Sequence, residues 1–184
     1  MYIRKKILFL LSLIFSLSVL SSDIEEIIVK GEYREKSLGE EDSSIVVIQS
    51  EQIKSQAIKH FQQLSHLVPN LNYAASDSRA RYFQIRGIGE RSGYQGTPNS
   101  SVGFLIDDID YSGQGGIATL FDVDQVEVFR GPQGSRSGAN ALAGLIYIKT
   151  KDPTEKFEGT SELTLGDYGT QNIGICLLYT SPSP

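Results

Sequence analysis

Two glycine-rich stretches are the first places where this sequence could support chemistry. Gly87, Gly89 and Gly93 imitate the fingerprint that binds a dinucleotide, but the third glycine falls one residue late and no helix is expected after it. The stretch 131–138 lacks the Lys-Ser/Thr ending of a phosphate-binding loop. Neither stretch therefore predicts nucleotide chemistry.

An acidic cluster and two histidines are the remaining candidates for catalysis or metal binding. Asp108 and Asp110 match the opening of a calcium-binding loop, but the twelfth position is Thr119, which cannot supply the bidentate carboxylate. His60 and His66 have no carboxylate cluster nearby, so we interpret them as helix-surface or packing residues. The sequence therefore predicts no enzyme, no cofactor and no metal site.

Two arginines stand at positions that favour recognition rather than catalysis. Arg86-Gly87 and Arg130-Gly131 each follow a predicted strand directly, and the glycine allows the backbone to turn sharply. In an isolated soluble domain these arginines would be solvated tips. Alternatively, their guanidinium groups face a partner surface that carries carboxylates, where bidentate ion pairs form away from bulk water.

The composition excludes some classes of partner but says little about the fold. The chain has 184 residues, of which 40% are hydrophobic and 21% charged, as in an ordinary globular protein. Its net charge of -5 and its scattered basic residues argue against a nucleic-acid partner. Cys176 is the only cysteine, so no disulfide can form within the chain.

The N-terminus predicts export. Basic residues 4–6 precede the apolar run 7–20, and small residues follow at Ser21 and Ser22, which is the pattern of a secretory signal peptide over residues 1–22. The run is about 14 residues long, whereas a membrane-spanning helix needs about 20.

The segment 23–44 differs in composition from the domain after it, because it is rich in Glu, Lys, Gly and Ser around one β-prone island, Ile27–Val29. So little apolar surface predicts a flexible tether.

Residues 45–153 have the pattern of a compact α+β domain. Ser50 is a plausible N-cap for a helix through Ala57, and a second helix with apolar residues from Phe61 to Val68 ends at Pro69. Alternating apolar residues predict strands, joined by the long glycine-rich loops 87–101 and 111–118. The predicted strands are 45–48, 70–74, 82–86, 102–106, 125–129 and 145–150.

The C-terminal part changes character again. Residues 154–175 alternate in two sets around the turn Gly166–Gly169, which predicts a strand, a tight turn and the start of a second strand. Residues 176–184, CLLYTSPSP, break that alternation and resemble translated sequencing-adapter sequence. We therefore expect a non-native tail over residues 176–184, which resequencing of the genomic locus would test.

The order of motifs resembles the plug domain of TonB-dependent outer-membrane receptors. The matching blocks are EEIIVKG, VVIQSEQI, LSHLVPNL, FQIRGIG, VGFLIDDI and DVDQVEVFRGPQGSRSGANALAGLIYIKTKDP, which together extend from Glu25 to about Ile175. The resemblance implies an α+β plug, a small mixed β-sheet with short helices, inside a barrel of about 22 strands. Only the first strand or strands of that transmembrane β-barrel would be present, so the barrel is incomplete.

The resemblance also implies roles for particular residues. The TonB box, which pairs edge-on with a strand of TonB in its complex with ExbB and ExbD, would be Glu25, Glu26, Ile27, Ile28 and Val29. A latch to glutamates of the chain's own missing barrel would comprise Arg86, Glu127 and Arg130. The ligand-contact loops would present Tyr94, Gln95, Asn99, Tyr111 and Gln114.

The function that the resemblance implies is active transport. The chain would be the plug of a transporter in the outer membrane of a Gram-negative bacterium, facing the barrel lumen and the periplasm. It would gate uptake of a large scarce nutrient: siderophore-iron, cobalamin, haem or an oligosaccharide. The alternative is a stand-alone periplasmic binding or signalling module without a barrel. The alternating segment 157–165 favours the transporter, because a free domain gains nothing from an exposed barrel-type strand.

Overall fold

The computed structural model of the chain describes a continuous domain and a hairpin after it. The predicted signal peptide, Glu25, Tyr94, Gln95 and residues 179–184 of the predicted tail lie outside the described residues. Within the part that is described, no helix combines the length and apolar character needed to cross a membrane. The described residues are 26–178, with the exception of 33, 35, 41, 76–78, 93–98, 115–117 and 139.

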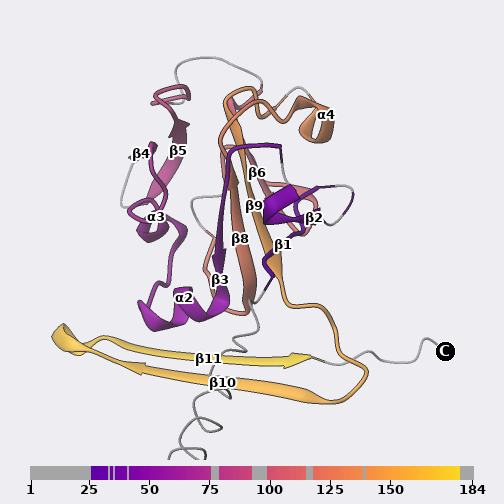
Figure 1. The fold of residues 1–184 in the computed structure, drawn as a ribbon. Coiled ribbons are helices and arrows are strands. Elements are labelled where there is room, and N and C mark those ends of the chain that lie inside the picture. Colours follow the sequence, from indigo (N-terminus) through magenta and orange to yellow (C-terminus); the bar gives the residue numbers. More distant parts are fainter. Residues whose placement is uncertain are drawn as a thin grey trace, which may run out of the picture.

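A five-stranded mixed sheet forms the centre of the fold, in the order β3, β8, β9, β6 and β7 (Figure 1). β3 (Ile45–Gln49) pairs antiparallel with β8 (Val123–Phe129), and β8 pairs antiparallel with β9 (Gly144–Thr150). β9 runs parallel to β6 (Val102–Ile106), which pairs antiparallel with the short β7 (Ile109–Asp110). The predicted mixed sheet is confirmed, and β7 is the strand that the sequence did not indicate.

The central strands of this sheet are buried on both faces. In β8, Val126 and Val128 point to one face while Glu127 and Phe129 point to the other, and none of the four has exposed surface. The apolar residues of β9 and β6 divide between the same two faces. Since both faces are apolar, each must be covered by another layer of the protein.

Two short helices and a separate hairpin cover the first face. The helices are α2 (Ser50–Ser55) and α3 (Phe61–Leu64). The hairpin consists of β4 (Leu71–Ala75) and β5 (Ala80–Ile85), which pair antiparallel with each other and not with the central sheet. The predicted strands 70–74 and 82–86 are therefore confirmed, each with its boundary moved slightly.

Both helices differ in extent from the sequence-based prediction. Gln49 rather than Ser50 is the N-cap of α2, and the helix ends before Ala57, whose φ of 52° is left-handed. α3 stops at Leu64, and turns continue the chain to Pro69. The predicted apolar face is nevertheless buried, because helices this short are held by the packing of their side chains rather than by intrinsic helix propensity.

The predicted tether covers the second face. β1 (Ile28–Val29) pairs antiparallel with β2 (Lys36–Ser37), and a 3-10 turn, η2 (Leu38–Glu40), comes next. Val29 has no exposed surface and packs in one cluster with Phe129. The described part of the predicted tether thus lies on the domain, because its few apolar side chains meet the uncovered apolar face of the sheet.

An antiparallel hairpin comes after the domain and lies below the sheet in Figure 1. β10 (Glu158–Leu165) and β11 (Gln171–Leu178) pair along their whole lengths, and the 3-10 turn η5 (Asp167–Gly169) joins them. β11 continues through residues 176–178. The prediction that the strand alternation breaks at Cys176 is therefore wrong for these residues.

The two faces of this hairpin differ in polarity. Toward the domain, Glu162 forms an ion pair with Lys59, and the thiol of Cys176 donates to the carboxylate of Asp122 at 2.7 Å. The opposite face is apolar and exposed, and it is formed by Leu163, Leu165, Ile173, Ile175 and Leu177.

Three phenylalanine rings form the centre of the core on the first face. The ring centroids of Phe61 and Phe83 are 5.0 Å apart and those of Phe61 and Phe104 are 5.2 Å apart, both in edge-to-face contact. Phe83 and Phe104 stack at 5.7 Å. Helix α3, the β4–β5 hairpin and the central sheet therefore meet at one aromatic cluster.

Replacing the central ring should test this core. We expect Phe104→Ala to lower the free energy of unfolding by about 3–5 kcal/mol, because the change empties a fully buried site. Chemical denaturation of the purified chain measures the loss. Leu142→Ala, at an exposed leucine, is the control and should change stability by less than about 0.5 kcal/mol. Equal effects of the two substitutions would contradict the assigned core.

Candidate functional site

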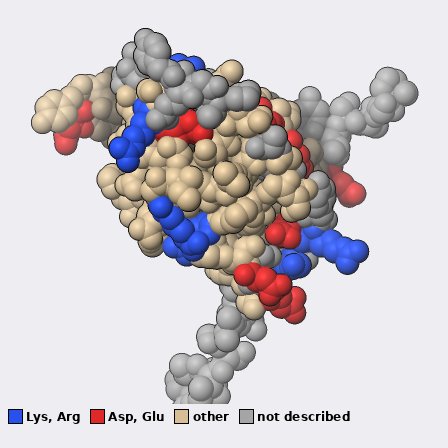
Figure 2. Space-filling view, turned by 90° about the horizontal axis from the view of Figure 1, so that it is seen from above, with Lys and Arg blue, Asp and Glu red and all other residues tan. Residues whose placement is uncertain are grey.

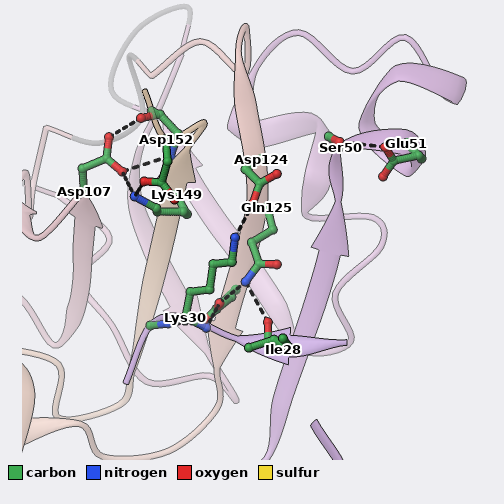
Figure 3. A network of polar contacts seen from close by, with 12 residues as sticks. Ile28, Lys30, Ser50, Glu51, Asp107, Asp124, Gln125, Lys149 and Asp152 are labelled. Atoms are coloured by element: carbon green, nitrogen blue, oxygen red, sulfur yellow. Dashed lines mark hydrogen bonds and ion pairs between the residues drawn. The ribbon is translucent and has the colours of Figure 1, made fainter. Parts of the chain in front are cut away.

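Most of the predicted TonB box lies across β8 on the second face of the sheet (Figure 3). The side-chain amide of Gln125 donates to the carbonyl of Ile28 at 3.0 Å. The backbone N–H groups of Lys30 and Gly31 donate to the two carboxylate oxygens of Glu127, at 2.6 and 2.8 Å. Side chains of the sheet thus hold the backbone of this segment.

Glu127 does not belong to a network that faces outward with the arginines. Its side chain has no exposed surface and points to the N-terminal segment, so its prediction as part of the plug–barrel latch is wrong. The physical reason is the alternation of β8, which places Glu127 on the same face as Phe129. A buried carboxylate is costly unless donors surround it, and backbone N–H groups and Gln125 provide them.

A β-bulge adds an ion pair to this contact. The register of β8 against β9 shifts between Val123 and Gln125, so Asp124 is the extra residue. Its carboxylate lies 2.7 Å from the ammonium nitrogen of Lys30. Both side chains are partly exposed, so the pair is worth at most about 1 kcal/mol and supplements the hydrogen bonds to Glu127.

The two predicted latch arginines lie at strand ends. Arg86 occupies a tight turn with Gly87: both have positive φ, and Ile85 and Ile88 exchange backbone hydrogen bonds across them. Arg130 is half-buried, and its Nε is buried without a hydrogen-bond partner among the described residues. Within that part of the chain, neither guanidinium has an ion-pair partner.

The strands that carry these arginines end close together. A Cβ atom placed on Gly144 would lie 2.6 Å from the Ile85 side chain and 2.3 Å from the Phe129 carbonyl oxygen. Arg86 follows Ile85 and Arg130 follows Phe129, so the β5 and β8 ends converge on this glycine. A larger residue at Gly144 would separate the two strand ends, which explains why glycine is needed there.

The described parts of the predicted ligand loops meet at the same end of the sheet. The carboxylate of Asp110 accepts hydrogen bonds from the Ser112 N–H at 2.8 Å and from the Asn140 side chain at 2.7 Å. Asn140 also accepts from the Ser100 N–H at 3.0 Å. These bonds tie the loops 99–101 and 111–114 to the segment before β9.

Asn99, Tyr111 and Gln114 are exposed beside this connection. Figure 2 views the molecule from above and shows charged side chains in small groups around a largely uncharged centre. Such a surface suits stacking and neutral hydrogen bonds more than recognition of a strongly charged ligand.

Asp110 of the rejected calcium loop and the nearby Asp107 have structural partners. Burial alone would raise the pKa of Asp110, but the hydrogen bonds from Ser112 and Asn140 outweigh it and hold the pKa below its usual range. Asp107, at the β6–β7 turn, accepts from the N–H and hydroxyl of Thr150. The His60 ring lies 3.0 Å from Arg79, and burial together with that positive charge lowers its pKa.

The sequence comparison identifies the family. Residues 37–145 match the model of the TonB-dependent receptor plug domain, which is more than half of the chain. The chain belongs to the TonB-dependent receptor plug family. The matched range includes α2, α3, both arginine positions and the central sheet up to the first two residues of β9.

Two curated relatives are similar over most of the plug. The pesticin receptor of Yersinia pestis is 28% identical over 120 residues, which are 65% of this chain and 17% of that protein. The ferripyoverdine receptor of Pseudomonas aeruginosa is 25% identical over 126 residues, which are 68% of this chain and 15% of that protein. The chain thus spans less than a fifth of the length of either relative.

Solved structures show the same plug fold. The ferric yersiniabactin uptake receptor of Yersinia pestis has a TM-score of 0.55 at 27% identity, covering 65% of this chain and 18% of that one. The outer-membrane ferripyoverdine receptor of Pseudomonas aeruginosa, bound to ferripyoverdine, has a TM-score of 0.66 at 20% identity, covering 81% and 19%. The second comparison shows the fold alone.

Sequence reasoning missed the residues that hold the N-terminal segment. Gln125 and Glu127 are spaced by two in a strand whose other residues, apart from Asp124, are apolar, which signals a polar pair on a buried face. Such a pair requires donors and acceptors from another segment. Gly31 is the second signal, because a Cβ there would lie 2.4 Å from a carboxylate oxygen of Glu127.

The strained turn at Arg86 gives a direct test of the plug geometry. Arg86→Gly should raise the free energy of unfolding by about 1 kcal/mol, since glycine adopts the positive φ of 54° without steric cost. Arg81→Gly, in the strand β5 that precedes this turn, should instead lower it by about 0.5–1 kcal/mol. Thermal unfolding of the purified variants measures both. A stability loss at Arg86→Gly equal to that at Arg81→Gly would contradict the turn.

Proposed function

We propose that this chain is the plug portion of a TonB-dependent active transporter of the outer membrane. In this proposal the signal peptide over residues 1–22 directs export, and the plug closes the lumen of a β-barrel that begins with β10. Ligand binds at the loop end of the sheet, and TonB, driven by ExbB and ExbD, pulls on the N-terminal segment. The reaction is gated transport, and no covalent step is needed.

The alternating polarity of the β10–β11 hairpin is the observation that carries this proposal. The exposed apolar face, which includes Leu163 and Ile175, suits lipid, while the polar face turns toward the plug. On a stand-alone periplasmic module the same face would be a site of aggregation. Sequencing of the intact genomic locus separates the two proposals, since only the transporter requires further barrel strands in the reading frame.

The two arginines support a contact between plug and barrel. Arg86 and Arg130 come from converging strand ends, and a buried Nε without a partner is costly unless a further group satisfies it. Barrel glutamates would form bidentate pairs with such guanidinium groups. We therefore keep Arg86 and Arg130 as the proposed latch and remove Glu127 from it.

A ferric siderophore is the ligand class that we favour. Two of the similar structures are receptors named for ferripyoverdine and for ferric yersiniabactin. Cobalamin, haem and oligosaccharides remain the other candidates. The plug supplies Asn99, Tyr111 and Gln114 to this proposed contact, together with Tyr94 and Gln95. Growth of a receptor-deletion strain on single iron sources, complemented with the full-length gene, tests the class.

Coupling to TonB is tested at the box. We expect Ile28→Pro to abolish crosslinking to TonB and ligand uptake in the full-length receptor, because proline removes an N–H that a paired strand needs. Site-directed crosslinking and radiolabelled-ligand uptake are the measurements. Ile28→Thr retains the N–H and is the matched control, with uptake expected near the unmodified level. Normal uptake by the proline variant would place the box elsewhere.

The latch is tested by permeability. Arg130→Ala should increase passive entry of small dyes and antibiotics several-fold, since the plug loses a bidentate contact to the barrel wall. Arg130→Lys retains the charge without the planar fork, so we expect an intermediate leak. Lys54→Ala, at an exposed residue of α2, is the control and should leave permeability unchanged. Equal permeability of all three variants would contradict the latch.

A further inference from the structure

Both hydrogen-bonding edges of the segment 27–31, which comprises the end of the TonB box and the two residues after it, are occupied by groups of this chain. On one edge, Ile28 and Val29 pair with β2, and the Leu38 N–H donates to the Ile27 carbonyl at 2.8 Å. In an antiparallel ladder, residues alternate in the edge to which their backbone groups point. The backbone carbonyl of Ile27 points toward β2. The backbone N–H and C=O groups of Ile28 and Lys30 therefore point to the opposite edge.

Side chains of β8 fill that opposite edge. The Ile28 carbonyl accepts from Gln125, and the Lys30 N–H donates to Glu127, as does the neighbouring Gly31 N–H. One carboxamide and one carboxylate therefore occupy the positions that the acceptors and donors of an incoming strand would take. A strand of TonB cannot pair with this edge while these contacts exist.

Close packing maintains the same arrangement. Val29 has no exposed surface, and a Cβ on Gly31 would lie 2.4 Å from a Glu127 oxygen and 2.8 Å from the Phe129 ring. The segment therefore reaches Glu127 only because residue 31 is glycine. A Cβ at this position therefore forces either the segment or the two buried side chains of β8 to shift.

We infer that Glu127 holds the TonB box in a masked state and sets how often the box is available to TonB. This inference rests on the proposed function and deepens it. Glu127 is a positioning residue, since it acts by holding the backbone of Lys30 and Gly31. When only a fraction of molecules has a released box, the apparent affinity for TonB is reduced by that fraction.

Two substitutions should unmask the box by independent means. Glu127→Gln removes the charge and replaces one acceptor oxygen with an NH₂ donor, which faces a backbone N–H. Gly31→Ala keeps Glu127 and displaces the segment sterically. Since hydrogen bonds to a charged group are the stronger ones, each change should raise the released fraction about ten- to hundredfold.

Exposure of the box is measured without TonB. The receptor used is the full-length protein with Val29→Cys, in which Cys176 and any other cysteine are replaced by serine. It is assayed in outer membranes from cells that lack TonB. The rate of N-ethylmaleimide labelling reports release of Val29. Trypsin cleavage after Lys30, in receptor with native Val29, gives a second rate that does not depend on the cysteine substitution.

Matched controls lie away from the box. Glu51→Gln changes an exposed glutamate of α2, and Gly134→Ala adds a methyl group where no atom lies within 4 Å. We expect both to leave the labelling and cleavage rates unchanged. If Glu127→Gln fails to assemble in the membrane, Gly31→Ala carries the test alone.

The outcomes separate the mask from the proposed function. One outcome is faster labelling and cleavage, together with a gain in affinity for the purified periplasmic domain of TonB by the same factor. This outcome supports both the mask and the proposed function. Faster labelling and cleavage without a gain in affinity support the mask but overturn the assignment of the box. Rates that stay at the control level in the assembled variants overturn the mask.

Discussion

The burial of the Glu127 carboxylate is the constraint on which the N-terminal part of the structure depends. The side chain lies in the middle of β8 with no access to solvent, and the backbone of Lys30 and Gly31 supplies donors. Removing the partners of a buried charge costs about 3–5 kcal/mol, which is comparable to the whole stability of a small domain. The segment before the domain is therefore a third layer of the fold.

Much of the sheet could be predicted from the sequence, because alternation and β-branched residues specify strands such as β3 and β6 locally. The helices were harder, since α3 has only one turn and its extent depends on how Phe61 packs between other elements. The docking of Val29 could not be predicted from its own neighbourhood. One valine carries too little apolar area to signal order until the second face of the sheet is known.

The candidate site shows the same division between local and distant information. Glycine after Arg86 and Arg130 indicates turns that present charge, and the structure leaves both guanidinium groups without an ion pair among the described residues. The family pattern assigned Glu127 to that group because it is close in sequence to Arg130. Strand geometry separates them, since positions an odd number of residues apart along a strand face opposite sides. Spacing therefore predicted the arginines correctly as strand ends but not the direction of the carboxylate.

The position of β3 has a mechanical consequence. β3 is the edge strand of the sheet and the first strand of the domain in the sequence, so it pairs only with β8. A force applied at the N-terminus passes through β1 and β2, then reaches an edge strand held on one side alone. Hydrogen bonds at such an edge can be loaded and broken in sequence, while β8, β9 and β6 keep their mutual pairing. The order of strands thus directs tension first to a strand that is held by one neighbour alone.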